Sequence, residues 1–534
     1  VFPSSSERTI MPLSLIPLPV SVEERPGNFL LEKTTRLVAH GDGAAEAARL
    51  LAKYLRPATG YSLPVVVGAA PAAGDIVLNE NGHDKADALG FVDESHSLTV
   101  TSSRVELSAA NVTGLKRAIQ TLRQLFPPAI FAEKKQSGVE WRLPAVKVSD
   151  RPAFRWRGLH FDVARHFFPV ADVERFIELA ARHKFNVFHW HLTDDQGWRV
   201  EIRKYPRLTA VGSVRPCTCV GHLSESPRRY DDAPYGGFYT QSDVKRVVAF
   251  AAERGVTVVP EIDMPGHCQA AIAAYPELGN VPGANPGVRP HWGISQNILS
   301  PEPDTLKFME NVLGEVIRLF PSRCIHIGGD EALKYEWDNS VAAQRRLAAI
   351  GGRNMDDLQA WFIGKIAAFL RAKGRVAIGW DEIVSGGLPA GAAVMNWHEA
   401  SPNSPMGRAL AAGHLVINAT AAHAYFDYYQ ADPGHEPLAI GGYLPCEKVY
   451  AFRPAPEWLK PAQKSLILGG QGQVWTEYVP DLARAEYMAY PRACALAERL
   501  WSPEGASTFR GFVDRLATHR ERLNAAGVHA HPLP

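Results

Sequence analysis

Two adjacent carboxylates, Asp330 and Glu331, follow a short apolar run and two glycines in the segment 324–331 (CIHIGGDE). This order is typical of a buried parallel strand that delivers charged groups to the open end of a sheet. Neighbouring side chains on a strand point to opposite sides, so we expect the two carboxylates to differ in task. One would face the reacting bond and the other would support something beside it. The alternative is a strand end that is capped by solvated charges.

Polar and aromatic residues recur at the ends of the other apolar runs in this part of the chain. Carboxylates and arginine can hydrogen-bond hydroxyl groups, and aromatic faces can pack against the apolar faces of a sugar ring. The combination therefore suits a neutral ligand with many hydroxyl groups. The residues concerned are Asp162, Arg165, His166, His189, His191, Asp194, Asp195, Trp198, Glu261, Asp263, His267, Trp380, Asp381, Glu382, Trp397, His398, Tyr425, Asp427, Gln471, Gln473, Trp475 and Glu477.

From Arg155 onward, eight apolar strand-like runs alternate with helical stretches. This rhythm predicts a closed (β/α)8 TIM barrel, in which active sites lie at the C-terminal ends of the strands. A doubly wound open sheet is the alternative, but no glycine-rich nucleotide-binding loop follows the first strand. Long connections at 203–240, 264–303 and 421–462 would cover the mouth of the barrel. The predicted strands are 158–163, 186–192, 256–262, 324–327, 376–379, 393–397, 415–419 and 466–469.

Regions on either side of the barrel complete the predicted domain organisation. Residues 1–150 combine short apolar runs with two helical patterns, 44–55 and 115–126, which predicts a small α/β sandwich with a scaffolding role. The catalytic barrel is predicted over 151–505. Residues 506–534 carry an apolar stripe at helical spacing, and we expect a terminal helix that packs on the barrel.

Composition argues against several classes of function. The formal net charge is +1 and no long basic run occurs, so nothing favours a nucleic-acid-binding surface. No apolar stretch reaches the ~20 residues that a membrane helix needs. The six cysteines form neither a disulfide framework nor a zinc motif, and the pairing of Cys217 or Cys219 stays open.

His189 and His191 lie on one side of a predicted strand, which is a spacing that barrel metal hydrolases use. In those enzymes the pair belongs on the first strand, with further ligands from later strands. Here it is on the second strand, and the nearby histidines lack that order. We therefore favour hydrogen-bonded structural histidines inside the barrel and expect no metal and no other cofactor.

The motifs together resemble the family 20 glycoside hydrolases, the β-N-acetylhexosaminidases. The resemblance runs in order from residue ~150 to 505, and one further segment, 235–242 (YGGFYTQS), looks like bacterial members. It implies an exo-acting enzyme that removes terminal β-linked N-acetylglucosamine or N-acetylgalactosamine with retention of configuration. The matching segments are 158–168 (GLHFDVARHFF), 186–199 (NVFHWHLTDDQGWR), 258–267 (VVPEIDMPGH), 326–331 (HIGGDE) and 469–477 (GGQGQVWTE).

The resemblance also implies catalytic roles. The substrate's own 2-acetamido oxygen would act as nucleophile, so family 20 departs from the two-carboxylate scheme of other retaining glycosidases. Glu331 would be the acid and then the base, and Asp330 would accept the acetamide N–H. Tyr425 would hydrogen-bond the acetamide oxygen, and Asp194 and His267 would hold Glu331.

Substrate-binding roles follow from the same motifs. Arg165 would bind the 3- and 4-hydroxyls of the non-reducing sugar, and Asp427 and Glu477 would bind the 4- and 6-hydroxyls. Four tryptophans complete the predicted set of substrate-binding residues. Trp361, Trp380 and Trp475 would line a pocket around the acetamide methyl and the ring face, and Trp397 is the fourth.

Two segments, 217–219 and 279–297, match no pattern of this family, so the preference among chitooligosaccharides, N-glycans and glycolipids stays open. A metal-dependent hydrolase and a sugar-binding protein without catalysis are the competing hypotheses. Glu331, Asp330 and Tyr425 together argue against the second, because a lectin needs no such set. We expect a monomer or homodimer that acts in the periplasm or outside the cell, where polymeric substrate is found.

Overall fold

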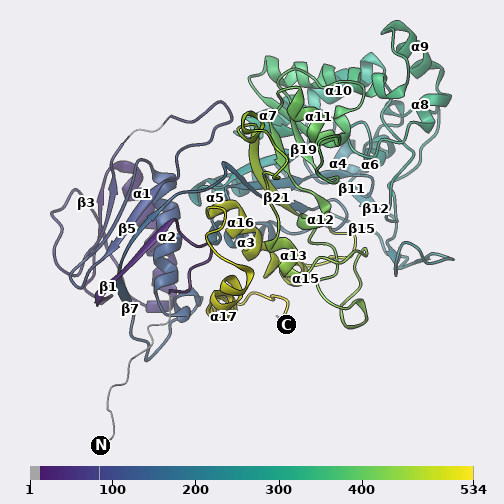
Figure 1. Cartoon of the computed structure of the whole chain (residues 1–534). Coiled ribbons are helices and arrows are strands. Elements are labelled where there is room, and N and C mark those ends of the chain that lie inside the picture. The colour runs from purple at the N-terminus through teal and green to yellow at the C-terminus, as the bar shows by residue number, and fades with distance from the viewer. Residues whose placement is uncertain (1–12, 83–84, 533–534) are drawn as a thin grey trace, which may run out of the picture. The chain divides into compact units, whose positions relative to one another are not determined.

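The computed structural model describes residues 13–82 and 85–532, which fall into two compact units. The first unit comprises residues 13–82, 94–151 and 502–528, and the second comprises 85–93, 152–501 and 529–532. Figure 1 traces the chain through both units. Among the described residues, no helix is both long and apolar enough to cross a membrane.

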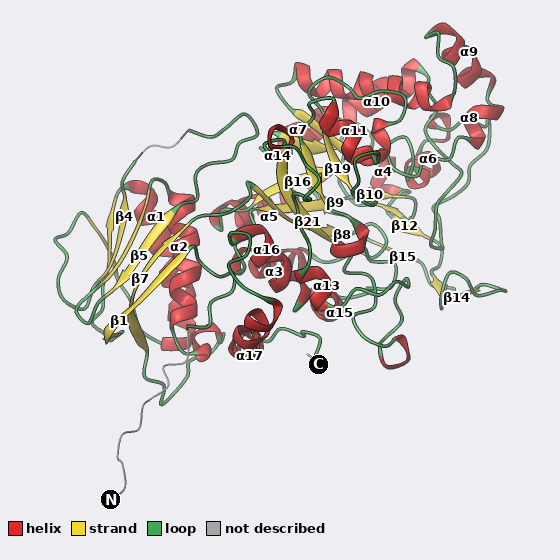
Figure 2. Ribbon diagram, viewed as in Figure 1, coloured by secondary structure: helices red, strands yellow, loops and turns green. Residues whose placement is uncertain are grey.

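The second unit is built on a closed barrel of eight parallel strands, which confirms the predicted (β/α)8 fold (Figure 2). The last strand pairs in parallel with the first, so the alternative of an open sheet is wrong. In barrel order the strands are β8 (Trp156–Asp162), β9 (Val187–His191), β16 (Thr257–Glu261), β17 (Cys324–His326), β18 (Val376–Trp380), β19 (Ala393–Asn396), β20 (Val416–Asn418) and β21 (Ile467–Val474).

Amphipathic helices cover the barrel. In the first of them, Val173, Phe176 and Ile177 are buried, as their helical spacing predicts. The helix that follows β9 begins with a capping box, in which the Thr240 and Asp243 side chains bond each other's backbone N–H. The main helices are α3 (Val170–Arg182), α5 (Gln241–Glu253), α7 (Pro303–Leu319), α10 (Met355–Ala372), α11 (Pro405–Ala411), α15 (Leu482–Ala489) and α16 (Arg492–Trp501).

Long connections leave the C-terminal ends of the strands, as predicted. They contain only short elements, and those that concern the site below are the turn after β17 and the segments after β9, β16 and β20. The short elements are β10 (Thr193–Asp194), β11 (Gly197–Trp198), α4 (Arg207–Ala210), β12 (Val214–Arg215), β13 (Cys219–Val220), β14 (Arg229–Tyr230), β15 (Tyr235–Gly236), α6 (Gln269–Ala274), α8 (Tyr335–Asn339), α9 (Val341–Ala349), α12 (Ala421–Ala424), α13 (Cys446–Tyr450) and α14 (Pro461–Lys464).

The first unit contains a seven-stranded mixed sheet on which two helices pack, as the predicted α/β sandwich requires. Its helix α2 begins at Asn111, whose side chain accepts the Gly114 N–H. In sheet order the strands are β1 (Ser21–Leu30), β7 (Arg142–Asp150), β5 (His96–Val100), β6 (Val105–Ala109), β4 (Ile76–Glu80), β2 (Leu37–His40) and β3 (Val65–Val67), and the helices are α1 (Asp42–Thr59) and α2 (Val112–Leu125).

The terminal helix α17 (Phe509–Ala525) groups with the first unit. Its Arg522 guanidinium donates to the carbonyl oxygens of Ser14 at 2.6 Å and Gln124 at 2.8 Å. The helix predicted within 506–534 is therefore present, and its packing on the barrel stays a prediction. An amphipathic stripe shows that a helix is buried on one side but does not identify its partner.

Candidate active site

Asp330 and Glu331 follow β17 in a turn with left-handed backbone. The φ angles are 66° at Gly328, 102° at Gly329 and 45° at Glu331, which only glycine adopts without strain. A Cβ atom at Gly328 would lie 1.6 Å from the Asp263 Oδ1 atom, so the site needs glycine for space as well. This turn separates the two carboxylates: the Asp330 side chain is 13% exposed and that of Glu331 is 34% exposed.

A single imidazole ring lies beside both carboxylates. The His267 Nε2 atom is 3.5 Å from an Asp330 oxygen and 3.5 Å from a Glu331 oxygen. Its Nδ1 atom is 3.2 Å from the Asp194 Oδ1 atom. Burial would lower the pKa of His267, but Asp194 and Asp330 raise it well above its ordinary value. The structure thus brings together four of the five predicted catalytic residues, with three carboxyl groups around the His267 ring. These carboxyl groups favour the charged imidazolium form of His267.

Arg165 lies beside the same network. Its guanidinium is 2.9 Å from Asp194, 3.2 Å from Asp162 and 3.9 Å from Glu477, and it lies over the ring of Trp475. Burial would lower its pKa, but Asp194, Glu477 and Asp162 hold the pKa well above its usual range. Asp194 therefore contacts both the arginine and the histidine, so hydroxyl-binding and proton-transfer candidates meet at one carboxylate.

Aromatic side chains form a wall across the barrel mouth. The ring centroids of Trp380 and Trp475 are 5.8 Å apart, and those of Tyr425 and Trp475 are 6.3 Å apart. Trp397 stacks on Tyr425 with the centroids at 6.2 Å. Burial raises the pKa of Tyr425 well above its usual range, so its hydroxyl keeps its proton and can donate a hydrogen bond. Three of the four predicted tryptophans belong to this wall.

Trp361 is the exception, and its prediction as a substrate-binding residue is wrong. It lies on α10 and packs against a separate apolar cluster that contains Trp337 and Leu358. The Arg346 guanidinium covers its ring at 5.0 Å from the centroid. Its position on a helix-like stretch already pointed to packing, because side chains on a barrel helix face the strands or the solvent rather than the mouth.

Several carboxylate oxygens of the site are buried and have no hydrogen-bond partner among the described residues. They are Asp330 Oδ1, Asp427 Oδ1 and Glu477 Oε2. Burial is the main cause that raises the pKa of each of these carboxyl groups. A buried oxygen without a partner is costly, so such atoms point to a ligand with N–H and O–H donors.

Glu382 is a site residue for which no role was predicted from the sequence. It follows β18, and its Oε2 atom accepts a hydrogen bond of 2.9 Å from the Trp397 indole N–H. Burial, with Asp330 and Asp381 nearby, raises its pKa to about 9. The signal was present in the segment 380–382 (WDE), in which carboxylates directly follow a tryptophan at a strand end.

His189 and His191 are hydrogen-bonded inside the barrel, as predicted. The Glu261 carboxylate lies 3.0 Å from the His189 Nε2 atom and 2.6 Å from the His191 Nδ1 atom. The His189 Nδ1 atom accepts from the Gln471 amide at 2.8 Å. Both rings thus contact a carboxylate of the protein itself, and His189 is also held by Gln471, which favours the structural interpretation over a metal hydrolase.

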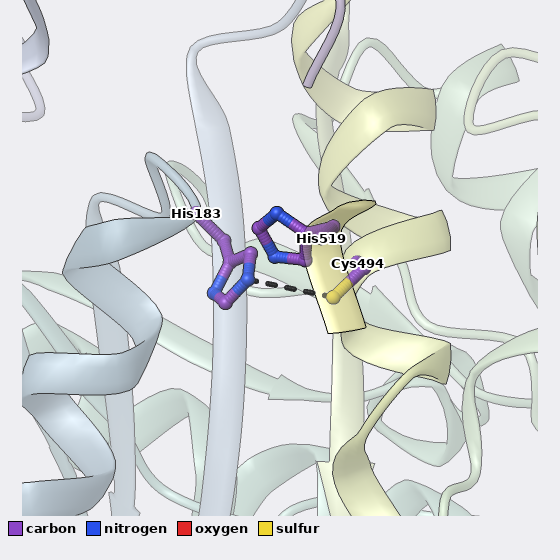
Figure 3. Close-up of side chains that lie close together, drawn as sticks. All are labelled: His183, Cys494 and His519. Atoms are coloured by element: carbon purple, nitrogen blue, oxygen red, sulfur yellow. Dashed lines mark hydrogen bonds between the residues drawn. The ribbon is translucent and has the colours of Figure 1, made fainter. Parts of the chain in front are cut away.

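A further buried cysteine and histidine lie away from the mouth. The His183 Nε2 atom is 3.4 Å from the Cys494 Sγ atom, as Figure 3 shows. The other ring nitrogen, Nδ1, is 2.7 Å from the Leu179 carbonyl oxygen at the end of α3. Burial raises the pKa of the Cys494 thiol well above its usual range, so the thiol is not an activated nucleophile.

A TIM barrel whose mouth combines paired carboxylates, a buried histidine, an arginine and an aromatic wall defines a glycoside hydrolase. Similarity to known families agrees with this class. The catalytic domain of glycosyl hydrolase family 20 matches residues 154–504, and domain 2 of the same family matches residues 13–151. The chain belongs to glycosyl hydrolase family 20 and is a glycoside hydrolase of the β-hexosaminidase type.

Similar proteins occur in bacteria and in mammals. A β-hexosaminidase of Porphyromonas gingivalis is 36% identical over 526 residues, which are 98% of this chain and 65% of that relative. A β-N-acetylhexosaminidase of Cellulomonas fimi is 32% identical over 98% of this chain and 96% of its own. The chain thus spans about two thirds of the first protein and nearly all of the second.

Solved structures are similar over the whole chain. The family 20 β-N-acetylhexosaminidase of Streptomyces coelicolor superposes with a TM-score of 0.82 at 31% identity, covering 98% of both chains. A mutant Streptomyces plicatus β-hexosaminidase in complex with its product, N-acetylglucosamine, gives a TM-score of 0.83 at 30% identity, covering 98% of this chain and 97% of that one.

Proposed function

We propose that the chain removes terminal non-reducing β-linked N-acetylglucosamine and N-acetylgalactosamine by substrate-assisted catalysis with retention of configuration. The observation that carries this proposal is the set of unpaired buried oxygens on Asp330, Asp427 and Glu477. A 2-acetamido sugar has an N–H group for Asp330 and hydroxyl groups for the other two. The N-acetylglucosamine complex of the Streptomyces plicatus relative supports this choice of sugar.

In the proposed first step, the acetamido oxygen attacks the anomeric carbon while Glu331 gives its proton to the departing glycosidic oxygen. The bond from the anomeric carbon to that oxygen breaks, and a cyclic oxazolinium ion forms. Asp330 accepts the acetamide N–H and stabilises the positive charge that develops there. The Tyr425 hydroxyl donates to the acetamido oxygen and positions it for attack.

In the second step, Glu331 takes a proton from water, and the oxygen of that water attacks the anomeric carbon. The oxazolinium ring opens and restores the acetamide. Two inversions at the same carbon give net retention. The 34% exposure of the Glu331 side chain supports this double role, because the group must meet first the leaving group and then water.

The substrate-binding residues support an exo mode. Arg165, Asp427 and Glu477 are buried groups that can bind the 3-, 4- and 6-hydroxyls of a terminal sugar. Trp380 and Trp475 offer faces for the ring, and Trp397 and Tyr425 offer a wall for the acetamide.

Hydrolysis of p-nitrophenyl β-glycosides of N-acetylglucosamine and of glucose tests the proposal. We expect rapid cleavage of the acetamido sugar alone, and inhibition by a thiazoline that mimics the cyclised intermediate. Equal cleavage of the two sugars would show that the acetamide is not the nucleophile and would refute the mechanism.

A further inference from the structure

The interior of the barrel contains one carboxylate that is surrounded by nitrogen atoms. Glu261, at the end of β16, is fully buried. Its Oε2 atom is 2.6 Å from His191 and 3.0 Å from His189, and its Oε1 atom is 2.9 Å from His326 and 2.8 Å from the Trp380 indole nitrogen. Strand register produces this cluster, because Glu261 is the paired neighbour of His191 on β9 and of His326 on β17.

His191 connects this cluster to the active site. Its Nδ1 atom is 2.6 Å from Glu261, and its Nε2 atom is 2.8 Å from the Asp194 Oδ2 atom. A neutral imidazole has only one N–H, whereas here both ring nitrogens face carboxylate oxygens. Burial would lower the pKa of His191, but Glu261 and the bond to Asp194 raise it well above its ordinary value. His191 is therefore an imidazolium between two carboxylates.

The contacts continue outward from Asp194. Its Oδ1 atom faces His267 at 3.2 Å, and His267 in turn lies 3.5 Å from Glu331. Glu261, His191, Asp194, His267 and Glu331 thus form a row in which carboxyl groups alternate with imidazole rings, which we call the charge ladder. Each inner member limits the orientations of the next, because both ends of every ring are occupied.

We propose that His191, anchored by Glu261, is a positioning residue that fixes Asp194 and, through His267, the orientation and proton affinity of Glu331. This inference rests on the proposed role of Glu331 as acid and base. His191 does not touch the sugar in this scheme. It holds the Asp194 Oδ2 atom so that the Oδ1 atom stays directed at His267, and its charge balances the two carboxylates beside it.

The effect on pH dependence has a defined sign. Removing the buried His191 cation leaves the ladder more negative, which favours the protonated form of the carboxyl groups along it. In the proposed mechanism Glu331 must carry a proton to act as the acid, so the alkaline limb of the rate profile reports on that requirement. Other charged or titratable groups also face the ladder. They are Asp162, His160, His189 and His326 around His191 and Glu261, Arg165, Asp195 and Asp263 around Asp194 and His267, and Asp330 and His398 around Glu331.

The test is the pH profile of kcat/KM for His191→Gln, measured on folded enzyme as checked by circular dichroism. We expect the alkaline limb to move to higher pH by about half a unit or more. The matched control is His183→Gln, which also removes a buried, hydrogen-bonded imidazole (Figure 3). His183 ends α3 and precedes β9, so it lies at the end of the barrel opposite the mouth. The alkaline limb of the His183→Gln profile should coincide with that of the wild type, even if the thermal stability of this variant falls.

The leaving group gives an independent readout. A 2,4-dinitrophenyl glycoside departs without much help from an acid, whereas chitobiose needs its glycosidic oxygen protonated. In His191→Gln the loss of kcat/KM should be at least about tenfold larger for chitobiose, because the defect lies in acid catalysis. Glu261→Gln, which keeps His191 but removes its anchor, should give the same selective loss for chitobiose and serves as the second variant if the first does not fold. Because this change removes a negative charge, its alkaline limb should move to lower pH.

Equal losses of kcat/KM for chitobiose and for the 2,4-dinitrophenyl glycoside, with the alkaline limb at its wild-type pH, would overturn the positioning role. This holds for whichever variant folds. The wild type reports separately on the proposed function in the same experiment. A wild type that cleaves acetamido sugars alone, alongside variants without selective loss, would refute the charge ladder and leave the proposed function standing. A wild type that cleaves glucosides equally well would refute the proposed function.

Discussion

Replacing Asp330 by asparagine keeps the shape of the side chain and removes its charge. In the proposed mechanism, positive charge develops on the acetamide next to this buried carboxylate. Two unit charges about 4–5 Å apart at an effective dielectric constant of about 20 interact by about 3–4 kcal/mol. Losing that interaction in the transition state alone should lower kcat by about 10²–10³-fold, with a much smaller change in KM.

The assay compares catalysis with binding of two ligands. We expect kcat for the p-nitrophenyl N-acetylglucosaminide to fall as stated, and the affinity for the thiazoline to fall by a similar factor. The affinity for neutral N-acetylglucosamine should change by less than about tenfold, since the product has no positive charge for Asp330 to stabilise.

The matched control is Glu315→Gln, another buried carboxylate that accepts backbone N–H groups. Glu315, on α7, accepts from Arg203 and Lys204 at 3.0 Å each, away from the barrel mouth. Its change should reduce thermal stability and leave kcat near the wild-type value. If Asp330→Asn weakens the thiazoline and N-acetylglucosamine equally, or costs less than tenfold in kcat, then no charge develops beside Asp330 and the reasoning is refuted.

Three further experiments, with four variants, test single features of the site. Burial raises the folded pKa of Glu382 from about 4.5 to about 9, so the wild type loses stability as the pH rises between these values. At pH 8 the free energy of unfolding of Glu382→Gln in urea should exceed that of the wild type by about 4–5 kcal/mol, with no difference near pH 4. Trp475→Phe should raise KM about tenfold, whereas Trp361→Phe should leave KM unchanged. Equal effects on KM would contradict the conclusion that Trp475 lines the pocket and Trp361 does not. Gly328→Ala, which crowds Asp263, should lower kcat/KM by about 100-fold in initial-rate assays, and wild-type activity would show that the turn tolerates a side chain.

The barrel and most of its mouth could be predicted because strand, turn and carboxylate follow one another along the chain. Each buried run ends at its charged residue, so the sequence alone places Asp330, Glu331 and Arg165 at one end of the barrel. Residues that lie together at the end of one strand are also neighbours in the sequence, so the sequence shows them together. The sandwich of the first unit was predicted for the same reason, from short alternating runs.

What could not be predicted depends on contacts between distant segments. Trp361 shares the chemistry of the pocket tryptophans, and although its helix-like stretch pointed to packing, its partner Arg346 is known only from the three-dimensional fold. The spacing of His189 and His191 places both rings on one side of a strand but does not reveal that Glu261, from another strand, lies between them. Register across separate strands decides that contact, and one sequence contains no direct record of it.

In the proposed mechanism, substrate selection and proton transfer both depend on Asp194. The same carboxylate lies 2.9 Å from Arg165 and 3.2 Å from His267. A sugar that draws the guanidinium toward its own hydroxyls therefore alters the counter-charge available to the histidine. A substitution at Arg165 that changes the specificity between sugar epimers should therefore also move the pH optimum. The two properties cannot be adjusted independently, because both depend on Asp194.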